Sequence, residues 1–310
     1  MNGAAISAVP AATPAALPSP GSLGAWILAA RPKTLTAAAS PVLVGAAVAW
    51  NEGTYSLAPA LAALVGAFCI QIGTNFANDL FDYKKGADTG ERLGPIRTAQ
   101  AGLLSVRELG AGTATAFGLA ALSGLYLIAC GGWPILAVGI LSILAGLAYT
   151  GGPFPLGYHG LGEVFVFIFF GPVAVAGTVF VQSGKLSPLA LFWSIPVGFL
   201  CAAILVVNNW RDVQTDERAG KRTIAVRFGK KFTKALYISL VVLPFLLSIS
   251  AAFYFHRGTL FLPLLAFPFA WKLAGIFAGS ELGPALNDLL AQTAQILFFY
   301  SLLLAIGIAL

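Results

Sequence analysis

Residues 191–223 read LFWSIPVGFLCAAILVVNNWRDVQTDERAGKRT, an apolar stretch that changes abruptly into a polar one. The first 17 residues carry no charge, whereas the next 16 contain two asparagines, three acids and four bases. Such a change is typical of a transmembrane helix that ends at the membrane surface. The apolar run at 57–78 ends in the same way, in NFANDLFDYKKGAD at 75–88. The sequence therefore predicts two helices that leave a membrane in polar clusters of one kind.

The composition of the whole chain agrees with this interpretation. Of its 310 residues 58% are hydrophobic and 10% are charged, and the mean hydropathy is +0.86. Soluble proteins carry about 25% charged residues. Backbone groups in lipid must be satisfied within their own segment, which favours helices, and the runs lack the alternation of barrel strands. We predict an all-α integral membrane protein of nine transmembrane helices around a central cavity. The spans are expected at 34–50, 57–78, 109–129, 133–150, 161–181, 188–207, 235–254, 259–278 and 288–309.

The basic residues indicate the orientation of these spans. With the N-terminus in the cytoplasm, 16 of the 18 lysines and arginines fall on the cytoplasmic side, and only Lys185 and Arg257 fall outside. This split follows the positive-inside rule. We therefore expect a multi-pass protein of a bacterial inner membrane, with a cytoplasmic N-terminus and its polar clusters on the cytoplasmic side.

The first residues of the chain are expected to be disordered. Residues 1–22 are rich in Ala, Pro and Ser and lack periodicity, which predicts a disordered tail before a nine-helix domain at 23–310. The tail lacks the apolar core that a secretory signal would have.

The three cysteines lie in apolar runs without C-x-x-C spacing, so we expect neither disulfides nor a metal site from Cys69, Cys130 and Cys201.

The first polar cluster has helical spacing. Asn75, Asn78, Asp79 and Asp82 are spaced i, i+3, i+4 and i+7, which places all four on one helix face. Asp88 follows in the predicted loop. Like charges on one face repel each other unless a cation lies between them.

The second cluster repeats the pattern four spans later. Asn208, Asp212 and Asp216 are spaced i, i+4 and i+8, again on one face. Two halves of four helices would bring the clusters face to face across a cavity. Carboxylate and amide oxygens suit Mg²⁺, which usually binds one or two carboxylates together with substrate phosphates.

The surrounding residues suggest what such a site would bind. Nearby bases could hold the remaining phosphate oxygens: Lys33, Arg97, Arg211, Lys221 and Arg222. A diphosphate site at the mouth of a membrane cavity suits a ligand with an apolar tail, such as a prenyl diphosphate. Aromatic side chains of the fifth span could line the tail or shield an allylic carbocation: Phe165, Phe167, Phe169 and Phe170.

Other functional classes remain open from the residues alone. Charged cytoplasmic loops could explain one cluster, although two clusters in helical register make this explanation weak. A membrane transporter would also carry acids, but we expect those at mid-span, whereas these lie at span ends. A phospholipid-alcohol phosphotransferase is disfavoured because its D-x-x-D-G-x-x-A-R pattern is absent.

Four stretches of the chain resemble the UbiA superfamily of membrane prenyltransferases, which have nine transmembrane helices and two Asp-rich motifs. They are RPKTL at 31–35, NFANDLFDYKKGAD at 75–88 with GPIR at 94–97, YTGGPFPLGYHGLGE at 149–163, and NNWRDVQTDERAGKRTIAVRFG at 208–229. These stretches are most similar to the branch of the family that prenylates 1,4-dihydroxy-2-naphthoate.

The resemblance implies a role for each matched residue. It implies that Mg²⁺ and diphosphate are bound by Asp79, Asp82, Asp212 and Asp216, assisted by Asn75, Asn78 and Asn208. It also implies that phosphates or an acceptor carboxylate are contacted by Lys33, Arg97, Lys221 and Arg222. The loop with Tyr149 and Tyr158 would shape the acceptor pocket. Gly86 stands where the family commonly has a third acid, so the part of Asp88 stays open, and Glu163 could be a helix-dipole partner or a site residue.

The activity implied is transfer of a polyprenyl group to 1,4-dihydroxy-2-naphthoate with loss of CO₂, giving demethylmenaquinol for menaquinone synthesis. The cofactor would be Mg²⁺. The partners would be a polyprenyl diphosphate, the naphthoate and membrane lipid, and no nucleic acid is expected. Another aromatic acceptor, such as 4-hydroxybenzoate, or a phytyl donor is the alternative.

Overall fold

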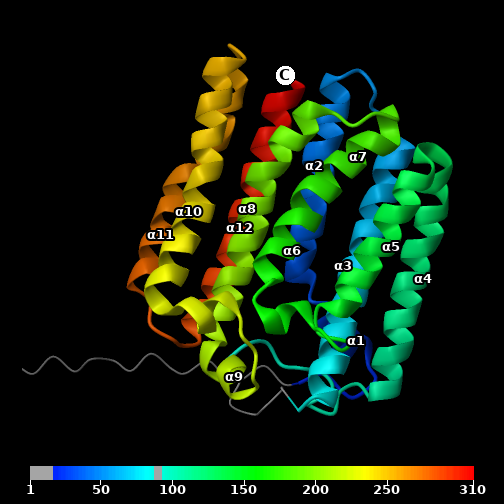
Figure 1. Ribbon diagram of the computed structural model, residues 1–310, viewed down its shortest axis with the longest axis vertical. Helices are drawn as coiled ribbons and strands as arrows, with labels where there is room; N and C mark the ends of the chain where they lie inside the picture. Colours follow the sequence, from blue (N-terminus) through cyan, green and yellow to red (C-terminus); the bar gives the residue numbers. More distant parts are fainter. Residues whose placement is uncertain (1–16, 87–92) are drawn as a thin grey trace, which may run out of the picture.

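The computed structural model describes residues 17–86 and 93–310, and these residues form helices without a single β-strand. The long helices stand side by side in an upright bundle (Figure 1). The predicted all-α fold is therefore confirmed.

Eight segments of the described chain are long and apolar enough to cross a membrane. They are Leu23–Asn51, Leu57–Lys84, Val106–Gly131, Gly162–Ser183, Pro188–Arg211, Ile224–Tyr254, Gly258–Gly279 and Ala285–Ala309. A ninth helix, α5 (Trp133–Ala148), has 16 residues. Its length of about 24 Å is less than the ~30 Å of a bilayer core. The predicted count of nine holds only when this shorter helix is included.

The first of these segments begins earlier than the predicted span. It consists of α1 (Leu23–Ala30), a 3₁₀ turn η1 (Pro32–Thr34) and α2 (Leu35–Asn51). The break lies at Arg31, whose φ of 52° is left-handed and ends α1. Trp26 of α1 packs edge-on against Phe76 with 5.4 Å between ring centroids. The prediction missed α1.

The last residues before α1 form hydrogen bonds of their own. The N–H of Gly21 donates to the carbonyl oxygen of Leu103 over 2.8 Å, and the Ser22 hydroxyl caps α1 by accepting from the N–H of Ala25. The end of the predicted tail 1–22 is therefore held to the bundle. The prediction for residues 1–16 lies outside the described residues.

The segment Gly162–Ser183 contains a change of helix type. It runs through α6 (Gly162–Ile168), a π-helical turn η3 (Phe169–Val173) and α7 (Ala174–Ser183). Pro172 has no N–H to donate and disturbs the α-helical ladder, which explains the turn. Such turns often mark functional positions.

The remaining elements complete the bundle. They are α3 (Leu57–Lys84), α4 (Val106–Gly131), η2 (Leu156–His159), α8 (Pro188–Arg211), α9 (Val213–Arg218), α10 (Ile224–Tyr254), η4 (Gly258–Ala266), α11 (Phe267–Gly279) and α12 (Ala285–Ala309). Among the most extensive helix pairs are α3 with α4, α2 with α12 and α8 with α10. The lower end of α3, α9 and α1 lie at one end of the bundle, and the C-terminus lies at the other (Figure 1).

Large aromatic side chains fill the half of the bundle that contains α8 and α10–α12. Trp193, Phe245 and Phe277 are fully buried there. Tyr237 and Tyr300 are also buried, and each hydroxyl pairs with another, Thr293 or Ser248, over 2.8 Å. This packed half provides a rigid wall for the site.

Candidate active site

A cavity of about 450 Å³ opens between α2, α3, α5, the α6–α7 segment and α8. Its two ends differ in chemistry. At the end where α3 and α8 finish, the lining is charged and consists of Lys33, Asp82, Arg97, Arg211, Asp212, Asp216 and Lys221. Further in, the lining is apolar and includes Ile70, Leu127, Val138, Phe165, Phe169, Phe170 and Val181.

Asp82, in the last turn of α3, is the centre of the first cluster. Its Oδ2 is 2.7 Å from Nη2 of Arg97, and both side chains are almost fully buried. Its Oδ1 accepts a hydrogen bond of 3.0 Å from the Tyr158 hydroxyl. Nζ of Lys221 is 3.4 Å from the same Oδ1. Donors of three residues thus converge on this carboxylate.

Lys221 connects the two clusters. Its Nζ lies 3.4 Å from Asp82 Oδ1 and 3.6 Å from Asp216 Oδ1. It also lies 4.8 Å from the centroid of the Tyr158 ring, which Lys85 contacts too, at 4.6 Å. The structure thus brings residues of both clusters to one cavity, as the recurrence of the cluster four spans later predicted.

Asp212 forms a bidentate pair with the neighbouring Arg211. Nε and Nη2 of Arg211 donate to its two oxygens over 2.9 and 2.7 Å. Arg211 also donates to Asn208 Oδ1 over 2.8 Å and to Asn287 Oδ1 over 2.9 Å. Arg211 is 2% exposed, so this planar pair is a fixed part of the cavity wall.

Asp79 differs from the other three acids because it does not line the cavity. Its Oδ2 accepts from the N–H of Thr98 over 2.9 Å and from the Thr98 hydroxyl over 2.7 Å. Its Oδ1 accepts from the N–H of Ala99 over 3.4 Å. Asp79 thus anchors the loop that carries Arg97, and its predicted role as a metal ligand stays a prediction.

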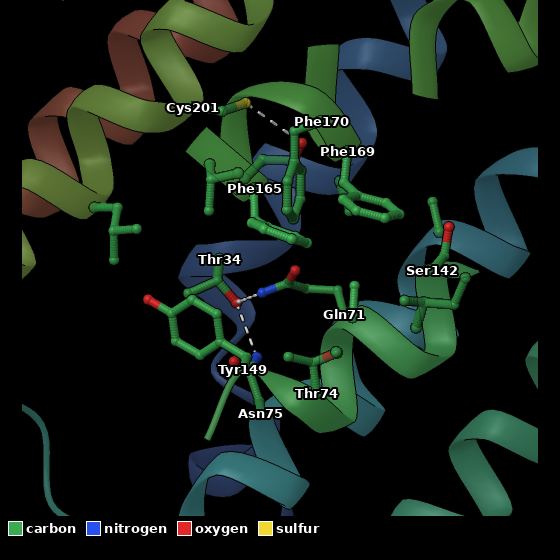
Figure 2. Close-up of a pocket in the computed structure, with 18 of the residues that line it drawn as sticks. Thr34, Gln71, Thr74, Asn75, Ser142, Tyr149, Phe165, Phe169, Phe170 and Cys201 are labelled. Atoms are coloured by element: carbon green, nitrogen blue, oxygen red, sulfur yellow. Dashed lines mark hydrogen bonds between the residues drawn. The ribbon is translucent and has the colours of Figure 1, made fainter. Parts of the chain in front are cut away.

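Asn75 holds the turn that carries Lys33. Its Nδ2 donates to the Ala30 carbonyl over 2.9 Å and to the Thr34 hydroxyl over 3.0 Å. Gln71 donates to the same hydroxyl over 3.2 Å, as Figure 2 shows. The left-handed end of α1 is therefore fixed on α3, with Lys33 at the cavity.

The remaining predicted residues fall into three groups. Asn78 lines the cavity and accepts a hydrogen bond of 2.8 Å from the Thr150 hydroxyl. Tyr149 also lines it and lies near the phenylalanines of the fifth predicted span (Figure 2). The Arg222 side chain is exposed and does not line the cavity, although its N–H donates to the Tyr158 carbonyl. The prediction for Asp88 lies outside the described residues.

Three of the four predicted phenylalanines line the inner part of the cavity, namely Phe165, Phe169 and Phe170. Phe167 instead packs against Phe199 with 5.3 Å between ring centroids. Two glycines of the same wall, Gly139 and Gly177, have no other atoms within 4 Å of an added Cβ. This end therefore has room for an apolar chain.

The electrostatics of the cavity mouth depend on burial and on its mixed charges. Burial lowers the pKa of Lys85; the Asp82 carboxylate opposes this effect, and Lys221 adds to it. Burial also raises the pKa of Tyr149, and the carboxylates of Glu163, Asp216 and Asp82 raise it further. The Tyr149 phenol therefore stays protonated and can donate a hydrogen bond.

The donor set suits a hard cation that arrives with phosphate. Among the described residues no three His, Cys, Asp or Glu side chains converge as a ready metal cage. Carboxylates and amide oxygens do line one end of the cavity: Asn78, Asp82, Asn208, Asp212 and Asp216. Mg²⁺ completes its coordination with phosphate oxygens and water, so these residues fit it.

Several residues of the site were not predicted. Thr98 anchors Asp79, Thr150 holds Asn78, and Asn287 connects Arg211 to the 93–97 loop through its bond to the Leu93 carbonyl. Of these three residues, only Asn287 could have been noticed in the sequence, because it is a polar residue directly before the last apolar run. Thr98 and Thr150 lie in loops, where a threonine carries no positional pattern.

Comparison with known proteins agrees with the sequence resemblance. The model of the UbiA prenyltransferase family matches residues 38–282. The chain is 38% identical over 276 residues to 1,4-dihydroxy-2-naphthoate octaprenyltransferase of Mycobacterium tuberculosis, covering 86% of this chain and 92% of that protein. It is 35% identical over 294 residues to the enzyme of that name from Escherichia coli, covering 92% and 95%.

Solved structures share the fold. A UbiA homolog from Archaeoglobus fulgidus bound to DMAPP and Mg²⁺ superposes with a TM-score of 0.63 at 16% identity, covering 91% of this chain and 99% of that one. This likeness agrees with the helical bundle described above. The chain belongs to the UbiA prenyltransferase family.

Proposed function

We propose that this protein transfers a polyprenyl group from its diphosphate to 1,4-dihydroxy-2-naphthoate with loss of CO₂, giving demethylmenaquinol. The observation that carries the proposal is one cavity with charged groups at one end and phenylalanines further in. Such a cavity matches a donor with a diphosphate head and an apolar tail. The names of the bacterial relatives support the naphthoate as acceptor.

The first part of the reaction breaks the bond between the allylic carbon and the diphosphate oxygen, and the electron pair leaves with the diphosphate. Arg97, Lys221 and Lys33 lie where they can bind the departing charge. Preorganised cations of this kind stabilise a leaving group because little reorganisation is needed. The faces of Phe165, Phe169 and Phe170 can stabilise the allylic cation.

The second part forms the new carbon–carbon bond. The ring carbon that bears the acceptor carboxylate attacks the allylic cation. The bond to that carboxylate then breaks, CO₂ leaves, and its electron pair restores the aromatic ring. The apolar inner lining of the cavity would keep water, which could capture the cation, away from the reacting carbon.

The acids would hold Mg²⁺ together with the diphosphate, and this assignment is part of the proposal. Asp82, Asp212 and Asp216 would be its ligands, assisted by Asn78 and Asn208. When bound, Mg²⁺ would neutralise charge on the diphosphate. Asp79 would act indirectly: through its hydrogen bonds to Thr98 it would position the loop that carries Arg97.

The test is mass spectrometry of products made by purified protein with 1,4-dihydroxy-2-naphthoate, several prenyl diphosphates and Mg²⁺. We expect prenylated, decarboxylated product that disappears with EDTA. Asp82→Asn and Asp216→Asn should lower product formation by at least about 10²-fold. Glu217→Gln is the matched control, because Glu217 is exposed and outside the cavity lining, and it should keep activity.

Three outcomes would contradict the proposal. Product from 4-hydroxybenzoate but not from the naphthoate would identify another acceptor. Full activity of both aspartate variants would separate the clusters from the chemistry. Ion or substrate flux in liposomes without covalent product would favour a transporter.

We also propose that the charged end of the cavity faces the cytoplasm of a bacterial inner membrane. The support is the split of basic residues, of which only Lys185 and Arg257 belong to the opposite loops. On intact cells, a membrane-impermeant maleimide should label the variant Lys185→Cys but not the variant Arg222→Cys. Labelling at 222 but not at 185 would reverse the orientation.

A further inference from the structure

A buried carboxylate lies behind the cavity wall, apart from the diphosphate site. Glu163 is in the first turn of α6, is 6% exposed, and is not part of the cavity lining. Its Oε1 accepts a hydrogen bond of 2.8 Å from Nδ2 of Asn209. Its Oε2 has no hydrogen-bond partner among the described residues. Keeping such a group buried costs free energy, which calls for a functional explanation.

Asn209 connects this carboxylate to the cavity. It lies on α8, is 6% exposed and lines the cavity, one residue from Asn208 of the second cluster. Because Nδ2 of Asn209 is the donor in this hydrogen bond, the NH₂ group of the amide faces Glu163. Its carbonyl oxygen is then the polar atom left for the cavity.

A hydrogen-bond donor, the Tyr149 hydroxyl, lies close by. A Cβ added to Gly162 would be 3.1 Å from the Tyr149 hydroxyl oxygen, so this hydroxyl lies against the start of α6. In Figure 2 the Tyr149 ring lies between Phe165 and Asn75. The corner therefore offers an acceptor, the Asn209 carbonyl, and a donor, the Tyr149 hydroxyl. A phenolic hydroxyl needs that combination, because it donates one hydrogen bond and accepts another.

We propose that Glu163 is a positioning residue for the aromatic acceptor: it orients Asn209 so that Oδ1 of Asn209 accepts a hydrogen bond from a phenolic hydroxyl of the acceptor. The inference rests on the function proposed above and deepens it. The hydrogen bond increases the electron density of the ring when the ring carbon attacks the allylic cation. The hydroxyl proton stays on its oxygen throughout, because loss of CO₂ returns the electron pair that restores the ring.

A purely structural role predicts a different result. A carboxylate in the first turn of a helix favours the helix dipole, and the bond to Asn209 also joins α6 to α8. Loss of a tether would affect both substrates and the stability of the protein. Loss of positioning affects the aromatic acceptor and leaves the prenyl diphosphate unaffected.

The experiment compares Glu163→Leu, Glu163→Gln, Asn209→Leu and the double variant Glu163→Leu/Asn209→Leu. It measures KM for each substrate and the binding of 1,4-dihydroxy-2-naphthoate without prenyl diphosphate, from naphthoate fluorescence. Glu163→Leu should raise KM and Kd for the naphthoate about tenfold, the effect of one hydrogen bond. KM for the prenyl diphosphate should change by less than about twofold, which is well below the tenfold effect of one hydrogen bond.

The remaining variants test the route of the effect. Glu163→Gln should restore naphthoate binding, because its side-chain oxygen still accepts from Asn209. Asn209→Leu should reproduce the defect, and the double variant should be no worse, since residues that act as one unit are not additive. Glu217→Leu, an exposed carboxylate outside the cavity, should leave both constants unchanged.

The proposal fails if Glu163→Leu changes both substrates equally, if it leaves naphthoate binding intact, or if the defects multiply in the double variant. Should Glu163→Leu not fold, an acceptor-selective defect in Asn209→Leu together with normal Glu163→Gln still supports it, and any other pattern overturns it. Wild-type protein that binds the naphthoate but never prenylates it would contradict the proposed function alone.

Discussion

At the scale of single residues, the neighbours Lys221 and Arg222 have different surroundings although both were predicted to bind phosphate. The Lys221 ammonium is shared by Asp82 and Asp216, whereas the Arg222 side chain is exposed. Lys221→Met should therefore lower kcat/KM by about 10²-fold, as expected for one preorganised cation. Arg222→Met is the matched control and should stay near wild type in a steady-state assay. Equal losses in both variants would contradict this distinction.

Asp79 gives a second prediction at this scale. If it anchors the loop of Arg97, removing its partner hydroxyl should imitate part of its loss. Thr98→Val should raise KM for the prenyl diphosphate roughly tenfold, the cost of one hydrogen bond to a charged group. Thr98→Ser keeps the hydroxyl and is the control. A large effect of Asp79→Asn on Mg²⁺ dependence, with none from Thr98→Val, would instead make Asp79 a metal ligand.

At the scale of helices, α7 should limit the length of the prenyl chain. Gly177 lines the cavity, and a Cβ there meets no atom within 4 Å, so a larger side chain would enter the open space. Gly177→Phe should reduce kcat/KM for long prenyl donors while short donors still react, measured with donors of graded length. Gly118→Phe on α4 is the control, because that glycine is exposed and outside the lining. An equal loss for all chain lengths would point to misfolding.

The helices also mark the limit of prediction from sequence. Apolar runs predicted the bundle, because they are a local pattern, and the recurrence of an acidic cluster four spans later predicted that Asp82 and Asp216 would face one cavity. The anchoring of Asp79 could not be predicted, since its donors belong to a loop near Thr98 whose path depends on tertiary packing. Likewise α1 was missed, because its break at Arg31 requires a left-handed residue that the sequence does not reveal.

At the scale of the whole molecule, the charged end of the site combines two parts of the bundle: the end of α3, and the segment that follows α8. Asp82 belongs to α3 and Asp216 to α9, and Lys221, which is shared between them, follows α9 in the chain. The Lys221 ammonium offsets the repulsion between these two carboxylates. A ligand held by both parts should therefore stabilise the complete bundle.

The prediction is a thermal shift that needs both components of the ligand. A non-reacting prenyl thiodiphosphate with Mg²⁺, at about 100 times its Kd, should stabilise the folded protein by about 2.7 kcal/mol. Detergent-solubilised protein should then unfold several degrees higher, measured by the fraction that stays monodisperse after heating. Mg²⁺ alone should give little shift, because the carboxylates already contact Arg97, Arg211 and Lys221. Asp216→Asn should abolish the shift even though Asp82 is intact, and a shift that survives would mean that one part of the bundle binds the ligand by itself.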